Sequence, residues 1–346
     1  MDCVGMDLHQ KFSELCVVDD AGEVVERATV STTEKALRRW FKRDPMRVAV
    51  EASSVSPWVD KLLRELGHEV YVVNPRRVRL IAEATLKTDK VDAETLARLV
   101  RIDPQFLSPI THRSEESRQQ RAVLRVRAVI VETRSKMISV VRGLVKQFGK
   151  RIPACSADLF VERFREFATE LDARVVAAVT PLIEEIEALG VRIDTADAEV
   201  KALASQREVV ERLDEIPGIG ELVAVAFVLC IDDPKRFKDS RDVAGFLGLR
   251  PAMRSSADVK HYGRVTKQGD KYMRSLLIQA AHAAMKSRKD SDIKRFGERL
   301  LGRVGKAKAH VAVARKLAVL MHRLWVTGER YRATSTPPPE PAREAA

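Results

Sequence analysis

The sequence has few aromatic side chains, few cysteines and no long apolar run. Phe, Trp and Tyr make up 5% of its 346 residues, so stacking on bases is not expected to dominate any recognition of nucleic acid. Its four cysteines, Cys3, Cys16, Cys155 and Cys230, show no Cys-x-x-Cys spacing, which argues against a zinc site and fits a reduced, cytoplasmic protein. The longest apolar run, residues 222–231, is too short to span a bilayer. We therefore expect no signal peptide and no membrane partner.

Acidic residues are outnumbered by basic ones. The chain carries 61 Lys and Arg against 49 Asp and Glu, a formal charge of +12. Such an excess favours a polyanionic partner, most often the phosphate backbone of a nucleic acid. The alternative is a basic surface that is simply solvated. The length is sufficient for two or three domains.

The first 110 residues are predicted to form an α/β domain. Apolar patterning and turn residues predict strands at 3–6, 13–18, 23–30, 47–50 and 69–73, and helices at 33–42, 56–65, 76–83 and 91–101. Three strands, a helix, a strand, a helix and a strand is the order of a ribonuclease H-like fold. This order predicts a ribonuclease H-like domain over residues 1–110.

The remaining chain is predicted to be mainly helical. Residues 111–212 carry two apolar seams typical of long helices that pair as a coiled coil, within the chain or between protomers. The seams are Val123, Val126, Ile130, Met137, Val141, Leu144 and Phe148, and Leu182, Ile186, Leu189, Ile193, Ala196, Val200 and Leu203. Residues 213–330 form a C-terminal domain with an apolar helix at 222–231, a Gly-rich basic loop at 245–270, and Ala-rich helices at 271–286 and 307–326. A disordered tail is expected over 331–346.

Four acidic residues stand where a carboxylate is out of place. Asp7 follows a short apolar stretch, Glu51 closes the run Val-Ala-Val, and Asp89 and Asp92 share one face at the start of a predicted helix. Carboxylates at the ends of neighbouring strands, joined by a pair three residues apart, are suited to hold the divalent ions that cut phosphodiesters. The alternative is a turn residue, a cap neighbour and two charges favoured by a helix dipole.

Two further segments suggest contacts with phosphate. Ile-Pro-Gly-Ile-Gly, which contains Gly218 and Gly220, resembles a helix-hairpin-helix element, whose glycines let backbone amides approach a phosphate; an ordinary interhelical turn is the alternative. Ser255 and Ser256 lie among basic residues that we predict to bind nucleic acid: Arg250, Arg254, Lys260, Arg264, Lys267, Lys271 and Arg274. A serine in such a setting binds phosphate or attacks it, and composition does not choose between the two serines.

In combination, these motifs resemble those of the DEDD-motif insertion-sequence transposases related to the Piv DNA invertase, some of which are bridge-RNA-guided recombinases. The resemblance extends over residues 3–327. It rests on Val-Gly-Met-Asp-Leu-His, Val-Glu-Ala-Ser, Lys-Thr-Asp-Lys-Val-Asp-Ala, Ile-Pro-Gly-Ile-Gly, and Gly-Leu-Arg-Pro followed by Gly-Asp-Lys-Tyr-Met-Arg-Ser-Leu-Leu. It implies that residues 1–110 form a RuvC-like domain, and that Asp7, Glu51, Asp89 and Asp92 are catalytic and bind Mg²⁺ or Mn²⁺.

The resemblance also implies a mechanism and partners. Ser256 corresponds to the family's nucleophile, which attacks a DNA phosphate and forms a phosphoserine link. The partners would be double-stranded donor and target DNA and a structured guide RNA. Relatives assemble as tetramers in which the carboxylate domain of one protomer meets the serine domain of another. A homo-oligomer, from dimer to tetramer, is therefore expected for this chain.

Two other functions remain open at this point. A RuvC-like metal-dependent endonuclease would hydrolyse DNA with water and form no covalent link. A non-catalytic nucleic-acid-binding coiled-coil protein would use its carboxylates for structure alone.

Overall fold

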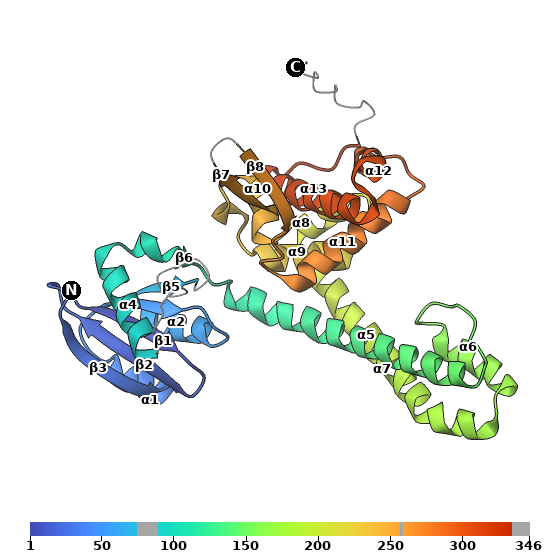
Figure 1. The fold of residues 1–346 in the computed structure, drawn as a ribbon, viewed down its shortest axis with the longest axis horizontal. Coiled ribbons are helices and arrows are strands. Elements are labelled where there is room, and N and C mark those ends of the chain that lie inside the picture. Colours follow the sequence, from blue (N-terminus) through green and yellow to red (C-terminus); the bar gives the residue numbers. More distant parts are fainter. Residues whose placement is uncertain (75–88, 257–258, 334–346) are drawn as a thin grey trace, which may run out of the picture. The chain divides into compact units, whose positions relative to one another are not determined.

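The computed structural model describes residues 1–74, 89–256 and 259–333. Contacts divide the chain into two compact units, Met1–His112 and Arg113–Ala346 (Figure 1). The predicted helix at 76–83 and nearly all of the predicted tail lie outside the described residues. Within the described residues, no helix is both long enough and apolar enough to span a bilayer. The predicted three-part division of residues 1–330 stays a prediction.

The first unit contains a six-stranded sheet in the order β3-β2-β1-β4-β5-β6. Its strands are β1 (Cys3–Leu8), β2 (Phe12–Val18), β3 (Val24–Ser31), β4 (Arg47–Glu51), β5 (Glu69–Val73) and β6 (Pro109–Ile110), and its helices are α1 (Glu34–Trp40), α2 (Ser56–Glu65), α4 (Asp89–Ile102) and the short 3₁₀ helix η1 (Pro104–Leu107). β1 pairs antiparallel with β2 and parallel with β4. The predicted element order is confirmed, and the mixed sheet is consistent with a RuvC-like domain. The two-residue β6 was not predicted.

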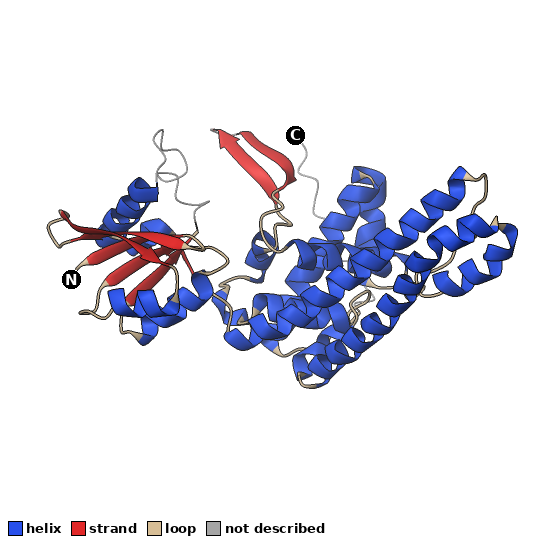
Figure 2. Cartoon of the chain, turned by 90° about the horizontal axis from the view of Figure 1, so that it is seen from below, coloured by secondary structure: helices blue, strands red, loops and turns tan. Residues whose placement is uncertain are grey.

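The side chains of β1 alternate between the two faces of the sheet, so they contribute to two separate hydrophobic cores. Val4 and Met6 pack in the core on the α1 and α2 side. Cys3 lies on the opposite face and packs with α4. Figure 2 shows helices on both sides of this sheet. Residues of β1 with odd numbers therefore face α4, which decides where Asp7 points.

The second unit is helical apart from one hairpin. Its elements are α5 (Glu115–Gln147), α6 (Phe160–Phe167), η2 (Ala168–Glu170), α7 (Ala173–Ser205), α8 (Glu208–Asp214), α9 (Glu221–Ile231), η3 (Pro234–Arg236), α10 (Ser240–Phe246), β7 (Pro251–Ser256), β8 (Val259–Val265), α11 (Lys271–Lys286), α12 (Asp292–Val304) and α13 (Lys306–Thr327). α9 is apolar all round and buried from Ala224 to Ile231, at the centre of the core that α11 and α13 complete.

Helices α5 and α7 pack against each other within the chain, antiparallel and side by side (Figure 1). The predicted seam of α7 is confirmed from Ile186 to Val200, whose members are buried, whereas Leu182 and Leu203 at its two ends are only half-buried. The predicted seam of α5 is partly wrong: Val126 and Phe148 are 57% and 60% exposed. The position skipped in that seam is filled by Arg134, which is buried near Gly190 of α7. That the pair forms a coiled coil stays a prediction.

The predicted Gly-rich loop at 245–270 is wrong in part. It contains the antiparallel hairpin of β7 and β8, in which Arg254 pairs with His261 and Ser256 with Val259. Periodicity missed these strands because their residues are basic and polar rather than alternately apolar. Backbone hydrogen bonds define the hairpin, and these leave no signal in hydrophobicity.

Candidate active site

Asp7 is the second-last residue of β1, and its side chain lies on the face of the sheet that packs against α4. Its side chain is buried, at 5% exposure. The strand extends two residues beyond the predicted end, so Asp7 lies within it and pairs with Glu14 of β2. A carboxylate in this position is unusual, because burial penalises its charged form unless a partner compensates.

Glu51 lies beside Asp7 at the same edge of the sheet. β1 and β4 are parallel, and Met6 is the partner of Val50. The next residue of each strand is therefore Asp7 in β1 and Glu51 in β4, both on the side of the sheet opposite Met6 and Val50. The predicted convergence of these two strand ends is supported by this register.

Helix α4 brings the other two carboxylates to the same face. Asp89 and Asp92 both lie in its first turn. Asp89 is exposed, whereas Asp92 is 7% exposed and its Oδ1 has no hydrogen-bond partner. The helix approaches β1 very closely: a Cβ added to Gly5 would overlap the carbonyl oxygen of Ala93. Gly5 therefore sets how near the first turn of α4 lies to Asp7.

His9 is a site residue that the sequence analysis missed. Its Nε2 lies 3.1 Å from Asp7 Oδ2 and 3.5 Å from Asp89 Oδ2. One ligand atom from each of Asp7, His9 and Asp89 lies within 4.8 Å of the others, a spacing that could hold a metal ion. The signal in the sequence was the Asp-x-His spacing, because residues two apart in extended chain share a face.

The electrostatics of this cluster fit a divalent cation. Burial raises the pKa of Asp7; the charge of His9 opposes the rise, and the charges of Asp89 and Asp92 add to it. Carboxylates this close repel one another unless a cation lies among them. The unpartnered buried oxygen of Asp92 is a hard ligand of the type that Mg²⁺ and Mn²⁺ accept. The residues present therefore fit the predicted metal.

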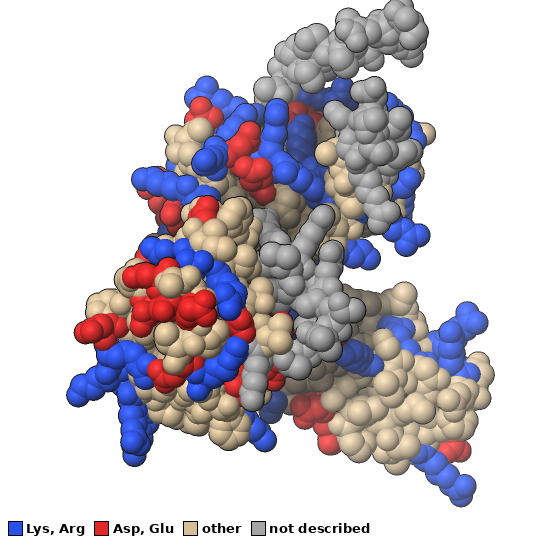
Figure 3. Space-filling model, turned by 60° about the vertical axis from the view of Figure 1, so that its left-hand side comes forward, with Lys and Arg blue, Asp and Glu red and all other residues tan. Residues whose placement is uncertain are grey.

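The two candidate serines lie at the end of β7. Ser255 pairs with Lys260 and Ser256 with Val259 across the hairpin. Only the backbone is described for these residues and for Arg254. Among the other predicted nucleic-acid-binding residues, Arg264, Lys267 and Lys271 are exposed. Figure 3 shows Lys and Arg side chains spread widely over the face it draws, with acidic side chains gathered among them.

Two of the predicted basic residues are engaged within their own unit. Arg250 forms an ion pair with Asp242 at 3.3 Å. Arg274 donates from Nη1 to the carbonyl oxygen of Leu247 at 3.2 Å. Their charges remain available to a polyanion, but part of their hydrogen-bonding capacity is already used.

The glycine turn lies between α8 and α9. Gly218 has a φ of +85°, and a Cβ there would overlap the carbonyl oxygen of Ala280 in α11. Gly220 precedes α9, and Asp214 Oδ1 is the atom nearest to the place of its Cβ, at 4.0 Å. Burial and the charge of Glu221 raise the pKa of Asp214. Its backbone conformation and its close packing against α11 thus explain why residue 218 is a glycine. Phosphate binding by this turn stays a prediction.

Comparison with known proteins identifies the chain. Residues 4–149 match the model for the DEDD transposases of IS110, described as "Transposase", and residues 210–298 match "Transposase IS116/IS110/IS902 family". The chain is 28% identical to the "Probable family 20 transposase" of Pseudomonas aeruginosa, over 95% of this chain and 98% of that protein. It is 26% identical to the "Transposase for insertion sequence element IS1111A" of Coxiella burnetii, over 95% and 91%, and 27% identical to "Putative transposase y4pF/y4sB" of Sinorhizobium fredii, over 95% and 85%.

The mixed sheet with carboxylates gathered at one edge, joined to a helical C-terminal region, is consistent with a RuvC-like DEDD transposase. The two models and the relatives together support a transposase of the IS110/IS116 family of insertion sequences. The family implies that the protein binds and cleaves DNA, and DEDD transposases typically use divalent metal ions.

Proposed function

We propose that this transposase cuts and exchanges DNA strands through a serine nucleophile, with divalent ions held by Asp7, Glu51, Asp89 and Asp92. The observation that supports the metal site is the convergence of three of these carboxylates on the α4 face of the sheet, where Asp92 Oδ1 is buried without a partner. When bound, Mg²⁺ or Mn²⁺ would supply positive charge at the attacked phosphate.

In this proposal the hydroxyl oxygen of Ser256 attacks a DNA phosphate and forms a phosphoserine bond. The bond from that phosphate to one deoxyribose oxygen breaks, and this oxygen leaves as a hydroxyl with the proton that the serine gives up. The Ser256 hydroxyl is a weak nucleophile, so the surrounding positive charge must stabilise the attacked phosphate. The exposed residues Arg264, Lys267 and Lys271, which lie at the base of the same hairpin and after it, are suited to hold the DNA backbone. Because these contacts release counterions, DNA binding should weaken steeply as salt rises.

The two serines provide a matched test. We would incubate the purified protein with end-labelled DNA that carries the element's own ends, with a nick to trap intermediates, and look for a protein–DNA adduct on a denaturing gel. Ser256→Ala should abolish the adduct, whereas Ser255→Ala should retain it. Cleavage that persists in Ser256→Ala without an adduct would indicate hydrolysis by water instead.

Replacing one of the metal-site carboxylates distinguishes the two enzymatic hypotheses, recombinase and endonuclease, from a non-catalytic binding protein. Asp7→Asn should abolish cleavage while DNA binding, measured by fluorescence anisotropy, stays within about threefold of the original, because phosphate contacts supply most of the affinity. Unchanged activity in this variant would make the carboxylates structural.

We further propose that the protein acts as a homo-oligomer in which the carboxylates of one protomer serve the serine of another. This assembly is the one that the family resemblance implies. Mixing inactive Asp7→Asn and Ser256→Ala protomers should then restore cleavage. If each site is complete within one chain, the mixture stays inactive.

Guidance by a structured RNA completes the proposal. The RNA would be transcribed from the element's own non-coding DNA and pair with donor and target. Sequencing the RNA that copurifies with the protein tests this directly. Recovery of no enriched transcript, together with cleavage by RNA-free protein, would contradict it.

A further inference from the structure

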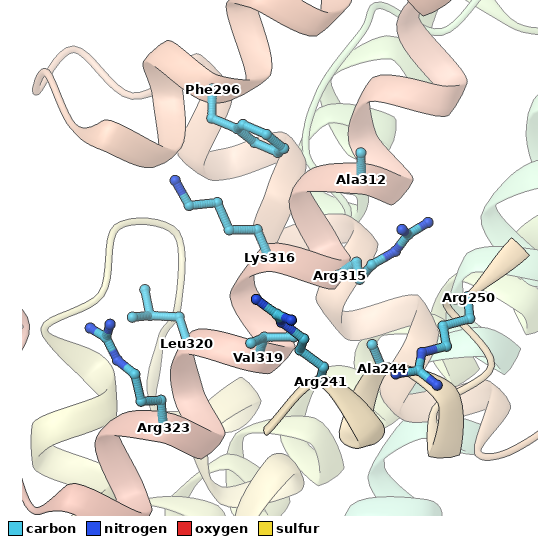
Figure 4. A pocket seen from close by; sticks show the side chains of 10 residues that line it. All are labelled: Arg241, Ala244, Arg250, Phe296, Ala312, Arg315, Lys316, Val319, Leu320 and Arg323. Atoms are coloured by element: carbon cyan, nitrogen blue, oxygen red, sulfur yellow. The ribbon is translucent and has the colours of Figure 1, made fainter. Parts of the chain in front are cut away.

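A pocket of about 480 Å³ lies in the second unit, and none of the residues that line it is assigned above to the metal site or as the nucleophile (Figure 4). It is lined by α10, α12 and α13 and by Arg250. α13 contributes one face, with Ala312, Lys316 and Leu320 spaced four residues apart. The opposite face of α13, including Val313 and Leu317, packs in the core. The pocket is therefore lined by a rigid helix whose position the core fixes.

Positive charge dominates the lining. Five basic residues contribute to it: Arg241, Arg250, Arg315, Lys316 and Arg323. Two of these charges are compensated by carboxylates: Asp242 pairs with Arg250 at 3.3 Å, and Asp292 pairs with Lys316 at 3.1 Å. Among the described residues, none forms an ion pair with Arg241 or Arg323. The pocket thus holds an uncompensated positive charge that an anion would neutralise.

Like charges are packed closely at one wall. Arg315 donates from Nε to the carbonyl oxygen of Leu249 at 3.1 Å, which fixes its guanidinium. Burial and the charge of Arg250 lower the pKa of Arg315. Both guanidinium groups line the same pocket, and arginine can bind an oxyanion such as a phosphate with two parallel hydrogen bonds.

The rest of the lining is apolar. Phe296 of α12, with Val319 and Leu320 of α13, forms an apolar wall between the charges. Lys316 Nζ lies over the Phe296 ring, 4.9 Å from its centroid. A pocket of this volume is of the size that takes a small organic ligand rather than a single ion. The preferred ligand therefore carries both a phosphate and a flat apolar group.

We propose that this pocket binds an unpaired deoxynucleotide of the DNA substrate, with its phosphate on the arginines and its base against Phe296. A nucleotide is the ligand that combines these two parts, and an aromatic side chain with nearby guanidinium groups is a common platform for an unpaired base. A base inside a duplex cannot reach the wall, because it is stacked and paired. The inference rests on DNA binding by the family and is independent of the proposed serine and metal chemistry.

The test compares two DNA ligands on the full-length protein. One is a fluorescent duplex. The other carries a short unpaired 3′ overhang at one end and is shortened at its other end, so that both ligands have the same number of phosphates. Anisotropy gives both affinities for the original protein, Phe296→Leu, Arg323→Gln and the control Arg299→Gln, an exposed arginine of the same helix as Phe296 but outside the pocket. Thermal unfolding checks that each variant is folded.

We expect the overhang to strengthen binding and the two pocket variants to remove that gain, by about tenfold for Phe296→Leu, in line with the loss of one stacked base. The control should weaken both ligands equally and slightly. Equal losses on both ligands in the pocket variants would overturn the proposal and reduce the pocket to general backbone attraction. Tighter binding of a ribonucleotide overhang, or displacement of the overhang by micromolar dAMP, would overturn the assignment to a DNA strand.

Discussion

Replacing Gly5 with alanine tests how the carboxylates are brought together. The new Cβ would overlap the carbonyl oxygen of Ala93 and lie 2.5 Å from the backbone nitrogen of Ala97, whereas real Cβ atoms essentially never come closer than 3.0 Å. Both contacts are backbone atoms of α4, so no side chain can rotate away. The helix must therefore shift by at least about 0.5 Å, and by more near Ala93.

The shift of α4 should reduce the rate of DNA cleavage strongly and the free energy of unfolding only moderately. Overpacking of this kind destabilises a domain by about 1–3 kcal/mol, which lowers the melting temperature of a unit of this size by several degrees. Asp89 and Asp92 move with α4, whereas Asp7 stays in the sheet. Since a displacement of about 1 Å in a catalytic group can reduce the rate roughly 100-fold, we expect a loss of DNA cleavage near that size.

The assay measures thermal unfolding and cleavage of labelled DNA on the same preparations, at a temperature where both proteins are folded. Gly143→Ala is the control, because Gly143 is an exposed residue near the end of α5 and nothing lies within 4 Å of the added Cβ. It should raise stability by up to about 1 kcal/mol. If Gly5→Ala keeps both full stability and full cleavage, α4 is not held against β1 as described and the account of the site fails.

Three further outcomes are expected. Because burial and neighbouring carboxylates raise the folded pKa of Asp7, its contribution to stability is complete below the usual aspartate range and is lost as pH rises through that pKa. Asp7→Asn should therefore raise the melting temperature of metal-free protein at neutral pH, with a gain that vanishes near pH 4, and should abolish stabilisation by Mg²⁺; a gain that persists in acid would contradict this. Asp232→Ala removes the acceptor for three hydrogen bonds from the start of α5 and should cost about 1–3 kcal/mol in urea unfolding. Gly218→Ala should destabilise the second unit through overlap with α11, and Gly220→Ala much less; equal effects would remove the packing explanation.

Most of the fold follows from local patterns in the sequence. The strand at 69–73 and the helices at 56–65 and 271–286 have the predicted bounds, because alternation or an apolar stripe is strong and a turn residue such as Gly67 marks the end. The hairpin of β7 and β8 was missed because its residues are basic. The short helices α6, α8, α10 and α12 were also missed, because each has only two to four turns in which to show a period.

The sequence predicted only those site residues that are unusual among their immediate neighbours in the chain. Asp7 and Glu51 stood out at strand ends, and Asp89 and Asp92 as a pair on one helix turn. His9 did not, because a histidine beside a strand end is unremarkable until α4 brings Asp89, which is distant in the sequence, to the same face of the sheet. The role of Gly5 is also non-local, since it depends on α4, which begins more than eighty residues later.

The same geometry explains why the cluster points to a cation rather than to structure. A structural carboxylate is normally compensated by a hydrogen bond or an arginine, as Asp232 is by the start of α5. Asp92 Oδ1 has no such partner, and the histidine beside Asp7 is exposed to solvent on its other side. The close packing of α4 on Gly5 therefore opposes the mutual repulsion of the carboxylates in the metal-free protein. Removing that repulsion by metal binding or by Asp7→Asn should stabilise the first unit in the same direction, while only the metal supports cleavage.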